Sequence, residues 1–212
     1  MSFLDFFRTP TRPATATSDY RLPLDPAICG PFSPPKQSRQ AALDSHALKW
    51  STCTACSLHE CRSQVVIGSG RLPATLFVLG KAPNLEADCS GEPFAGPQAS
   101  IFSQIVPPST KTFYAYLSAC GPSPEINSSQ QETCWPRVLE LLTLVRPKIV
   151  VCAGKEVDSF YIKHMQDVVA QLGYRPICIR INHPDYILQQ ADQSLEIAKA
   201  CLVLHPLLEK LC

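Results

Sequence analysis

Short apolar runs and segments of helical spacing alternate along the chain from about residue 38 onward. Four runs rich in Val, Ile, Leu and Phe are typical of buried strands, and they span 75–80, 113–118, 148–154 and 176–181. Apolar residues at helical spacing predict helices over 38–50, 135–145, 157–172 and 194–211. Strands that alternate with helices favour an α/β fold, here a three-layer αβα arrangement around a central, mostly parallel, four-stranded sheet.

The first 36 residues differ in character from the rest of the chain. Seven of the 20 prolines fall before Lys36, in a segment rich in Thr, Ser and Ala that shows no hydrophobic period. We therefore expect residues 1–36 to form a Pro-rich, mostly disordered tether and residues 37–212 to form the folded domain.

Composition and charge narrow the possible classes of protein. A hydrophobic content of 45% excludes disorder over the whole chain, and a net charge of +1 excludes a histone-like binder that attracts DNA by global charge. The first residues lack the basic and apolar regions of a secretory signal, and no apolar stretch is long enough to span a membrane. We expect a protein of the reducing cytoplasm, in which clusters among the 11 cysteines serve a metal or catalysis.

Four cysteines have the spacing of a metal site. Cys53 and Cys56 form a C-x-x-C pair, while Cys120 and Cys134 flank a loop rich in Pro, Ser and Asn. Spacing alone does not favour an iron-sulfur cluster over zinc, and scattered core cysteines are the plain alternative. The other seven are interpreted as core or surface thiols, with Cys61 the nearest competitor as a ligand; they are Cys29, Cys61, Cys89, Cys152, Cys178, Cys201 and Cys212.

Catalytic or binding residues are expected in particular loops. In an open parallel sheet, ligands bind outside the carboxyl ends of the strands. The loops that follow Gly80, Ser118, Gly154 and Ile181 are therefore the places where a site is predicted.

Taken together, the motifs of the chain resemble those of a known family. After the C-x-x-C pair come Gly80-Lys81-Ala82-Pro83-Asn84, Asp88, Gly91, Pro93-Phe94-Ala95-Gly96, Cys134-x-Pro136, Arg146-Pro147-Lys148 and His183-Pro184. In order and spacing these are similar to the motifs of the iron-sulfur uracil-DNA glycosylases of family 4, over about residues 50–210. The resemblance implies the uracil-DNA glycosylase fold, DNA as the partner, and a [4Fe-4S] cluster on Cys53, Cys56, Cys120 and Cys134.

The same resemblance implies roles for individual residues. Base excision needs a ring that stacks on the flipped base, a donor for the departing base and a group that orients water. Phe94 matches the stacking aromatic, His183 matches the catalytic histidine, and Asp88 keeps a family position from which a carboxylate could orient water. Base or DNA contacts are expected from Gly80, Lys81, Ala82, Pro83, Asn84, Phe94 and Tyr116.

Three substitutions separate the chain from the family pattern. Lys81 stands where the family has glutamate, Asn84 replaces a glycine, and Tyr116 aligns with the asparagine that grips the uracil edge. A lysine with an ordinary pKa near 10.4 is a poor base at neutral pH. The sequence thus supports two classes of function: a glycosylase acting on uracil or another altered base, and a non-catalytic DNA-binding or repair-accessory protein. A desolvated Lys81 that attacks the sugar is a third reading.

Residues 3–7, Phe-Leu-Asp-Phe-Phe, look like the short peptide by which many bacterial replication and repair proteins bind the sliding clamp, although the usual leading glutamine is absent. Aromatic side chains at the end of a tether are expected to enter a pocket, on a partner or on the domain itself. We expect a monomer whose tether lets the domain search DNA while it remains held.

Overall fold

The computed structural model describes residues 38–123 and 125–211, and in these ranges five strands form one sheet. The strands are β1 (Ser69–Gly70), β2 (Leu76–Gly80), β3 (Thr112–Tyr116), β4 (Ile149–Ala153) and β5 (Ile177–Ile181), in the order β1-β3-β2-β4-β5. The last four are parallel to one another, while β1 pairs antiparallel with β3. The four predicted strands are confirmed. The short β1 adds a fifth strand that the apolar runs did not predict.

Eight α-helices lie in the described ranges, together with a short 3-10 helix over Ser57–Glu60. The helices are α1 (Arg39–Ser51), α2 (Leu85–Ser90), α3 (Pro97–Ile105), α4 (Ser128–Val145), α5 (Lys155–Lys163), α6 (Met165–Leu172), α7 (Pro184–Leu188) and α8 (Gln193–Glu209). The helix predicted over 157–172 is divided at His164, which ends α5 and precedes α6. The short helices α2, α3 and α7 were not predicted.

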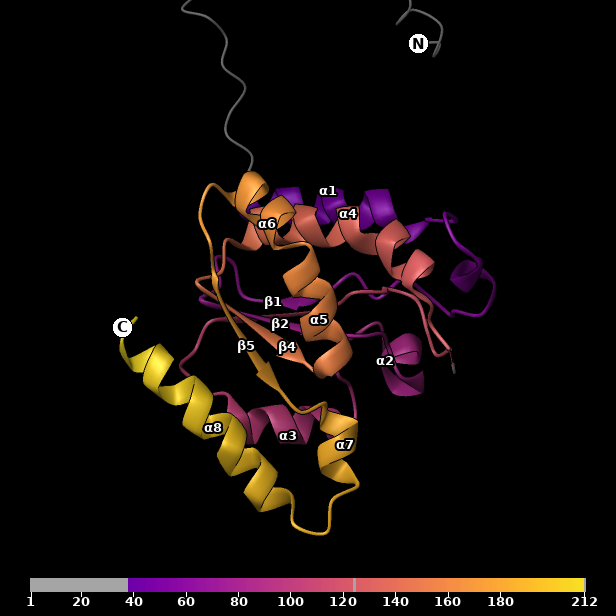
Figure 1. Cartoon of the computed structure of the whole chain (residues 1–212). Coiled ribbons are helices and arrows are strands. Elements are labelled where there is room, and N and C mark those ends of the chain that lie inside the picture. The colour runs from indigo at the N-terminus through magenta and orange to yellow at the C-terminus, as the bar shows by residue number, and fades with distance from the viewer. Residues whose placement is uncertain (1–37, 124, 212) are drawn as a thin grey trace, which may run out of the picture. The chain divides into compact units, whose positions relative to one another are not determined.

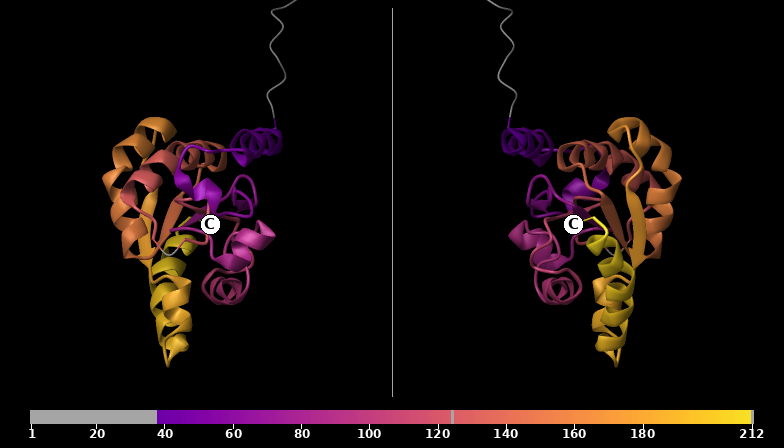
Figure 2. Two further views of the ribbon diagram at one scale, coloured as in Figure 1. Left: turned by 90° about the vertical axis from the view of Figure 1, so that its right-hand side faces the viewer. Right: turned by 90° about the vertical axis from the view of Figure 1, so that its left-hand side faces the viewer.

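Helices cover both faces of the sheet (Figures 1 and 2). Because successive strand residues point to opposite faces, Val78 and Val151 pack against α3 and α8, whereas Phe77 and Val150 pack against α4, α5 and α6. Helix α1 packs on α4, outside the second layer. The predicted three-layer αβα fold is confirmed.

The register of the sheet brings several loops to one edge. Gly80 at the end of β2 lies opposite Tyr116 of β3, and Ala153 at the end of β4 lies opposite Ile181 of β5. The segments that follow β2, β4 and β5 therefore begin side by side, as the carboxyl ends of parallel strands do.

Two further expectations from the sequence concern the N-terminal segment and membrane-spanning helices. The predicted tether and the segment 3–7 lie outside the described residues. Within the described part of the chain, none of the helices combines the length and the apolar character needed to span a membrane.

Candidate functional site

A cavity of about 330 Å³ opens at the carboxyl edge of the sheet. It lies where the loops after β2, β4 and β5 meet, which are three of the four places indicated by the sequence. Its walls are Lys81, Ala153, Gly154, Lys155, Glu156, Val157 and His183. Of the residues expected to act on a base, Lys81 and His183 share this cavity.

His183 is held at the start of α7 as its N-cap residue. The backbone N–H of Asp185 donates a hydrogen bond to His183 Nδ1 at 3.2 Å, so the neutral ring carries its proton on Nε2. Burial lowers the pKa of His183; the Asp185 and Glu156 carboxylates oppose this shift and the Lys81 ammonium adds to it. At neutral pH the ring is therefore uncharged, with one N–H free to donate.

Lys81 does not stand alone at the end of β2. Its Nζ forms a salt bridge of 2.5 Å with Glu156 Oε2, from the first turn of α5. The Glu156 side chain is 68% exposed, so its carboxylate remains accessible to water. Sequence analysis missed Glu156, although it pointed to the loop after Gly154 as a candidate region.

Phe94 lies in the core and not on an open loop surface, in contrast to the expectation. Its side chain is 2% exposed, and its ring packs at 4.7 Å between centroids on Tyr116 and on Phe102. The backbone N–H of Phe94, which has a φ of 56°, donates to the Tyr116 hydroxyl at 2.7 Å. Both rings pack so closely on Gly80 that a Cβ there would lie 2.6 Å from Phe94 and 2.7 Å from Tyr116.

Tyr116 is one of three aromatic residues whose rings pack on Phe94, together with Phe102 and Tyr114. It is fully buried and occupies the space beside Phe94 where the resemblance places the uracil-gripping residue. Burial raises the pKa of Tyr116 well above its usual value; the hydrogen bond from Phe94 opposes this shift and the Asp185 carboxylate adds to it. The phenol therefore stays protonated at any ordinary pH.

Asp88, which was expected to orient water, does not line the cavity. It is 1% exposed in α2, and its Oδ2 accepts a hydrogen bond from the backbone N–H of Ser63 at 2.8 Å. The side chain amide of Gln64 also donates to the Asp88 carbonyl oxygen. The carboxylate joins α2 to the segment after the C-x-x-C pair, because buried carboxylates require hydrogen-bond partners.

The remaining residues of the first motif, Ala82, Pro83 and Asn84, lie in the segment that joins β2 to α2. Asn84 caps α2, since its side chain oxygen accepts from the Ala87 N–H at 2.8 Å. The Pro83 carbonyl lies so near Gly121 that a Cβ at Gly121 would approach it to 2.3 Å. Ala82 stands between Lys81 and Pro83 in the chain. The turn over residues 80–84 thus lies against the segment that starts at Cys120.

The four predicted ligand cysteines come from segments that the fold places together. Gln130 Nε2, near the start of α4, donates to Ser57 Oγ at 3.1 Å and so joins the segment after Cys56 to the helix that carries Cys134. Burial raises the pKa of Cys120; a hydrogen bond from Arg62 opposes this shift, and the Cys134 and Cys56 thiols add to it. Cys53 follows the last turn of α1, with its N–H bonded to the Trp50 carbonyl.

Two arginines donate to sulfurs of this group. Arg62 Nη1 lies 3.0 Å from Cys120 Sγ, and Arg137 Nε lies 3.4 Å from Cys134 Sγ. Arg137 is 1% exposed and also donates to the carbonyls of Ile67 and Tyr116. No carboxylate of the described residues forms a salt bridge with it. A buried guanidinium needs a compensating anion, and thiolates at the cysteines would supply it.

Comparison with known proteins gives a consistent result. The family model described as "Uracil DNA glycosylase superfamily" matches residues 67–207. The type-4 uracil-DNA glycosylase of Thermotoga maritima is 23% identical over 171 residues, which cover 74% of this chain and 89% of that protein. The enzymes of the same name from Archaeoglobus fulgidus and Saccharolobus solfataricus are 24% and 25% identical, and the matches cover 56% and 62% of this chain and 63% and 64% of those proteins.

The matched range begins just before β1 and ends within α8, so it contains the whole sheet and every residue that lines the cavity. It covers well over half of the 212 residues. From the cavity, the sheet order and this match we conclude that the chain belongs to the uracil DNA glycosylase superfamily.

Proposed function

We propose that this protein is a uracil-DNA glycosylase-like DNA repair protein, which hydrolyses the N-glycosidic bond of uracil or another altered base in DNA. The observation that carries the proposal is the cavity at the carboxyl edge, where a neutral His183 lies beside the Lys81–Glu156 pair. Relatives named type-4 uracil-DNA glycosylases support the reaction class and DNA as the substrate.

In this proposal His183 stabilises the departing base. When the bond between C1′ and the base nitrogen breaks, the bonding electrons leave with the base, and negative charge gathers on its oxygen. The Nε2–H of His183 is the donor for that oxygen, because Nδ1 is already occupied by the Asp185 N–H. A fixed donor of this kind contributes about 10²- to 10³-fold to the rate.

The Lys81–Glu156 pair is assigned the role of orienting the water that attacks the sugar. The Glu156 carboxylate can accept a hydrogen bond from the water that adds to C1′, while the Lys81 ammonium holds that carboxylate in place. Asp88, buried against Ser63, is assigned a positioning role for the adjacent loop. The chain thus offers a carboxylate from α5, whereas the family pattern described in the sequence analysis has a glutamate in the motif after β2.

We further propose that Cys53, Cys56, Cys120 and Cys134 hold a [4Fe-4S] cluster. The donors fit, since Arg62 and Arg137 both point at sulfurs of the set and Arg137 is buried without a carboxylate. When bound, the cluster supplies a cross-link between segments that are distant in sequence.

The second candidate is a non-catalytic DNA-binding protein of the same fold, and Tyr116 favours it. Its ring packs on Phe94 where the resemblance places the uracil-gripping asparagine, and one phenol hydroxyl cannot replace the donor and acceptor pair of an amide. If that ring is what limits uracil excision, the double variant Lys81→Glu/Tyr116→Asn will excise uracil faster than the wild type. Equal rates would mean that the pocket differs from that of its relatives at further positions.

The decisive experiment measures excision and binding on the same DNA. Oligonucleotides containing uracil, hypoxanthine or other altered bases are incubated with wild type, His183→Ala and the control His205→Ala, which changes a histidine of α8 bonded to Ile105. We expect abasic product from the wild type and the control, and a loss of about 10²-fold or more in His183→Ala. No product from the wild type on any base, with DNA binding retained, would establish the second candidate.

The cluster has its own test. Anaerobically purified protein should be brown, with broad visible absorbance from thiolate-to-iron charge transfer. Cys120→Ser should lose this colour, whereas Cys201→Ser in α8 should keep it. A colourless wild type that contains zinc would contradict the cluster assignment.

The proposal also covers residues 3–7, which lie outside the described residues, and the oligomeric state and location of the protein. We propose that residues 3–7 bind the sliding clamp and that the protein acts as a monomer in the reducing cytoplasm. A peptide of residues 1–12 should bind the clamp in a fluorescence-anisotropy titration, and Leu4→Ala with Phe7→Ala should abolish binding. Equal binding of both peptides would remove the clamp as a partner.

A further inference from the structure

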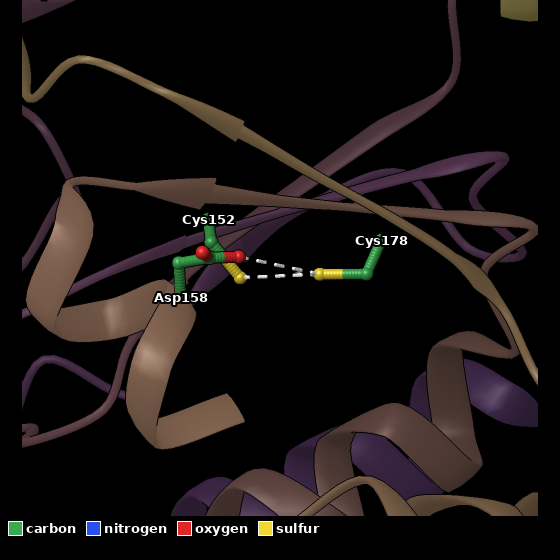
Figure 3. A group of neighbouring side chains, drawn as sticks. All are labelled: Cys152, Asp158 and Cys178. Carbon is green, nitrogen blue, oxygen red and sulfur yellow. Dashed lines mark hydrogen bonds between the residues drawn. The ribbon is translucent and has the colours of Figure 1, made fainter. Parts of the chain in front are cut away.

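A second group of ligand atoms lies apart from the four-cysteine group. It joins Cys152 of β4, Asp158 of α5 and Cys178 of β5, whose side chains point toward one another (Figure 3). One ligand atom from each lies within 4.8 Å of the other two. The two sulfurs are 3.7 Å apart, and Cys178 Sγ is 3.9 Å from Asp158 Oδ1. The sequence offered only the interpretation of core or surface thiols.

These distances fit a tetrahedral zinc ion. With Zn–S bonds of about 2.3 Å and Zn–O bonds of about 2.1 Å, tetrahedral angles separate two sulfurs by about 3.8 Å and a sulfur from an oxygen by about 3.6 Å. The observed separations of 3.7 Å and 3.9 Å agree within a few tenths of an ångström. At this separation the two sulfurs are not joined as a disulfide, whose bond is about 2.05 Å long, and one thiol donates a hydrogen bond to the other.

A buried hydroxyl without a hydrogen-bond partner belongs to the same region of the protein. Tyr161 lies one helical turn after Asp158 on α5 and belongs to the apolar cluster that contains Cys152. Its side chain is fully buried, yet its hydroxyl has no hydrogen-bond partner among the described residues. Burial raises the pKa of Tyr161, and the nearby Cys178 and Cys152 thiols add to this shift. The hydroxyl is therefore a buried polar group near the two thiols that the described residues leave without a hydrogen-bond partner.

The surroundings can support the charge of such a site. Asp158 Oδ2 lies 3.7 Å from Arg180 Nη1, so the carboxylate has an outer partner while Oδ1 faces the sulfurs. Two thiolates and one carboxylate around Zn²⁺ carry a net charge of −1, which the Arg180 guanidinium beside Asp158 partly offsets. Cys178 is half-buried and the Asp158 side chain is 17% exposed, which leaves a path from solvent.

We propose that Cys152, Asp158 and Cys178 bind one Zn²⁺ ion, and that the two thiols release their protons as the ion binds. The ion would tie the first turn of α5 to β4 and β5. Because Glu156 stands on that same turn, the ion would also fix the helix that presents Glu156 to Lys81.

The test compares zinc content in the full-length protein. Wild type, Cys178→Ala, Asp158→Asn and the control Cys201→Ala are reduced, freed of reductant without oxygen, and titrated with Zn²⁺ alone or with Cd²⁺ alone as an optical probe. Wild type and Cys201→Ala should bind one zinc per chain more than Cys178→Ala, with a matching difference in cadmium–thiolate absorbance. Asp158→Asn, which keeps both thiols, should bind that zinc about 10-fold or more weakly.

Alkylation gives a second readout that is independent of any effect on folding. Zinc should slow the reaction of Cys178 with iodoacetamide in the wild type, and an added chelator should restore it. Equal zinc content in wild type and Cys178→Ala, or an unchanged alkylation rate, would overturn the proposal.

Discussion

The hydroxyl of Tyr116 offers a sharp test of how the Phe94 loop is held. Tyr116→Phe removes one oxygen and leaves the ring in place. That oxygen accepts the only hydrogen bond found for the Phe94 N–H in the described residues, at 2.7 Å, and Phe94 is 2% exposed. The perturbation therefore leaves a buried backbone donor without an acceptor and changes little else.

The magnitude follows from that loss. A buried donor left unsatisfied costs about 1–3 kcal/mol. Phe94 also adopts a φ of 56°, a conformation that non-glycine residues hold at a cost of about 1–3 kcal/mol when their surroundings impose it. The hydrogen bond is one of those surroundings, so the loop could relax and recover part of the loss. We expect a net destabilisation of about 1–3 kcal/mol, or a fall in Tm of roughly 2–4 °C per kcal/mol for a domain of this size.

The assay is urea unfolding of the wild type, Tyr116→Phe and the control Tyr114→Phe. Tyr114 lies on the same strand and the same face and also contacts Phe94, but its hydroxyl has no hydrogen bond among the described residues. The control should stay within about 0.5 kcal/mol of the wild type. If both variants lose the same stability, or if Tyr116→Phe loses none, the hydrogen bond does not hold the loop and the reasoning fails.

Two further predictions concern buried or part-buried carboxylates. Asp88→Ala should lower the free energy of unfolding by about 1–3 kcal/mol because the Ser63 N–H loses its acceptor, and Asp88→Asn should restore most of it; a loss in excision per folded molecule with unchanged stability would instead mark Asp88 as catalytic. Burial raises the pKa of Glu140, but hydrogen bonds chiefly from Lys49 and Trp50 outweigh it and leave the pKa lowered. The stability that these hydrogen bonds give is fully present above pH 4.5, the pKa of Glu140 in the unfolded chain. It is lost as the pH falls through the lower pKa of Glu140 in the folded protein. Acid titration of Trp50 fluorescence should show α1 loosening from α4 in the wild type, and Glu140→Gln should already be loosened at neutral pH.

The sequence was informative where local pattern suffices. Apolar runs indicated β2 through β5, and helical spacing indicated α1, α4 and α8, because burial on a sheet or helix face repeats with a fixed period. It was silent on β1, whose two residues owe their pairing to β3 alone. It also missed α2 and α7, which are too short to show a period, and α3, although its buried Ile101, Phe102 and Ile105 recur at helical spacing. The break at His164 was hidden, since both halves of 157–172 carry apolar residues at helical spacing.

For the site, the sequence determined which residues are present and at which ends of strands they stand. The resemblance singled out His183 and Lys81, and they share one cavity because the carboxyl ends of parallel strands share one edge. Tertiary structure alone decided which of the expected side chains face the cavity. Asp88 turns inward and accepts a hydrogen bond from the Ser63 N–H, because a buried polar atom needs a partner. Tyr116 packs on Phe94, because the fold brings the two rings together.

The partners of charged and thiol groups also depend on the fold. Glu156 meets Lys81, and Cys152 meets Cys178, only because β4 lies between β2 and β5 in the sheet. Strand order is set by how whole layers bury their apolar faces, and no local pattern in the sequence encodes it. The sequence by itself therefore determined the kinds of chemistry available to this protein, and the tertiary structure decided which groups act together.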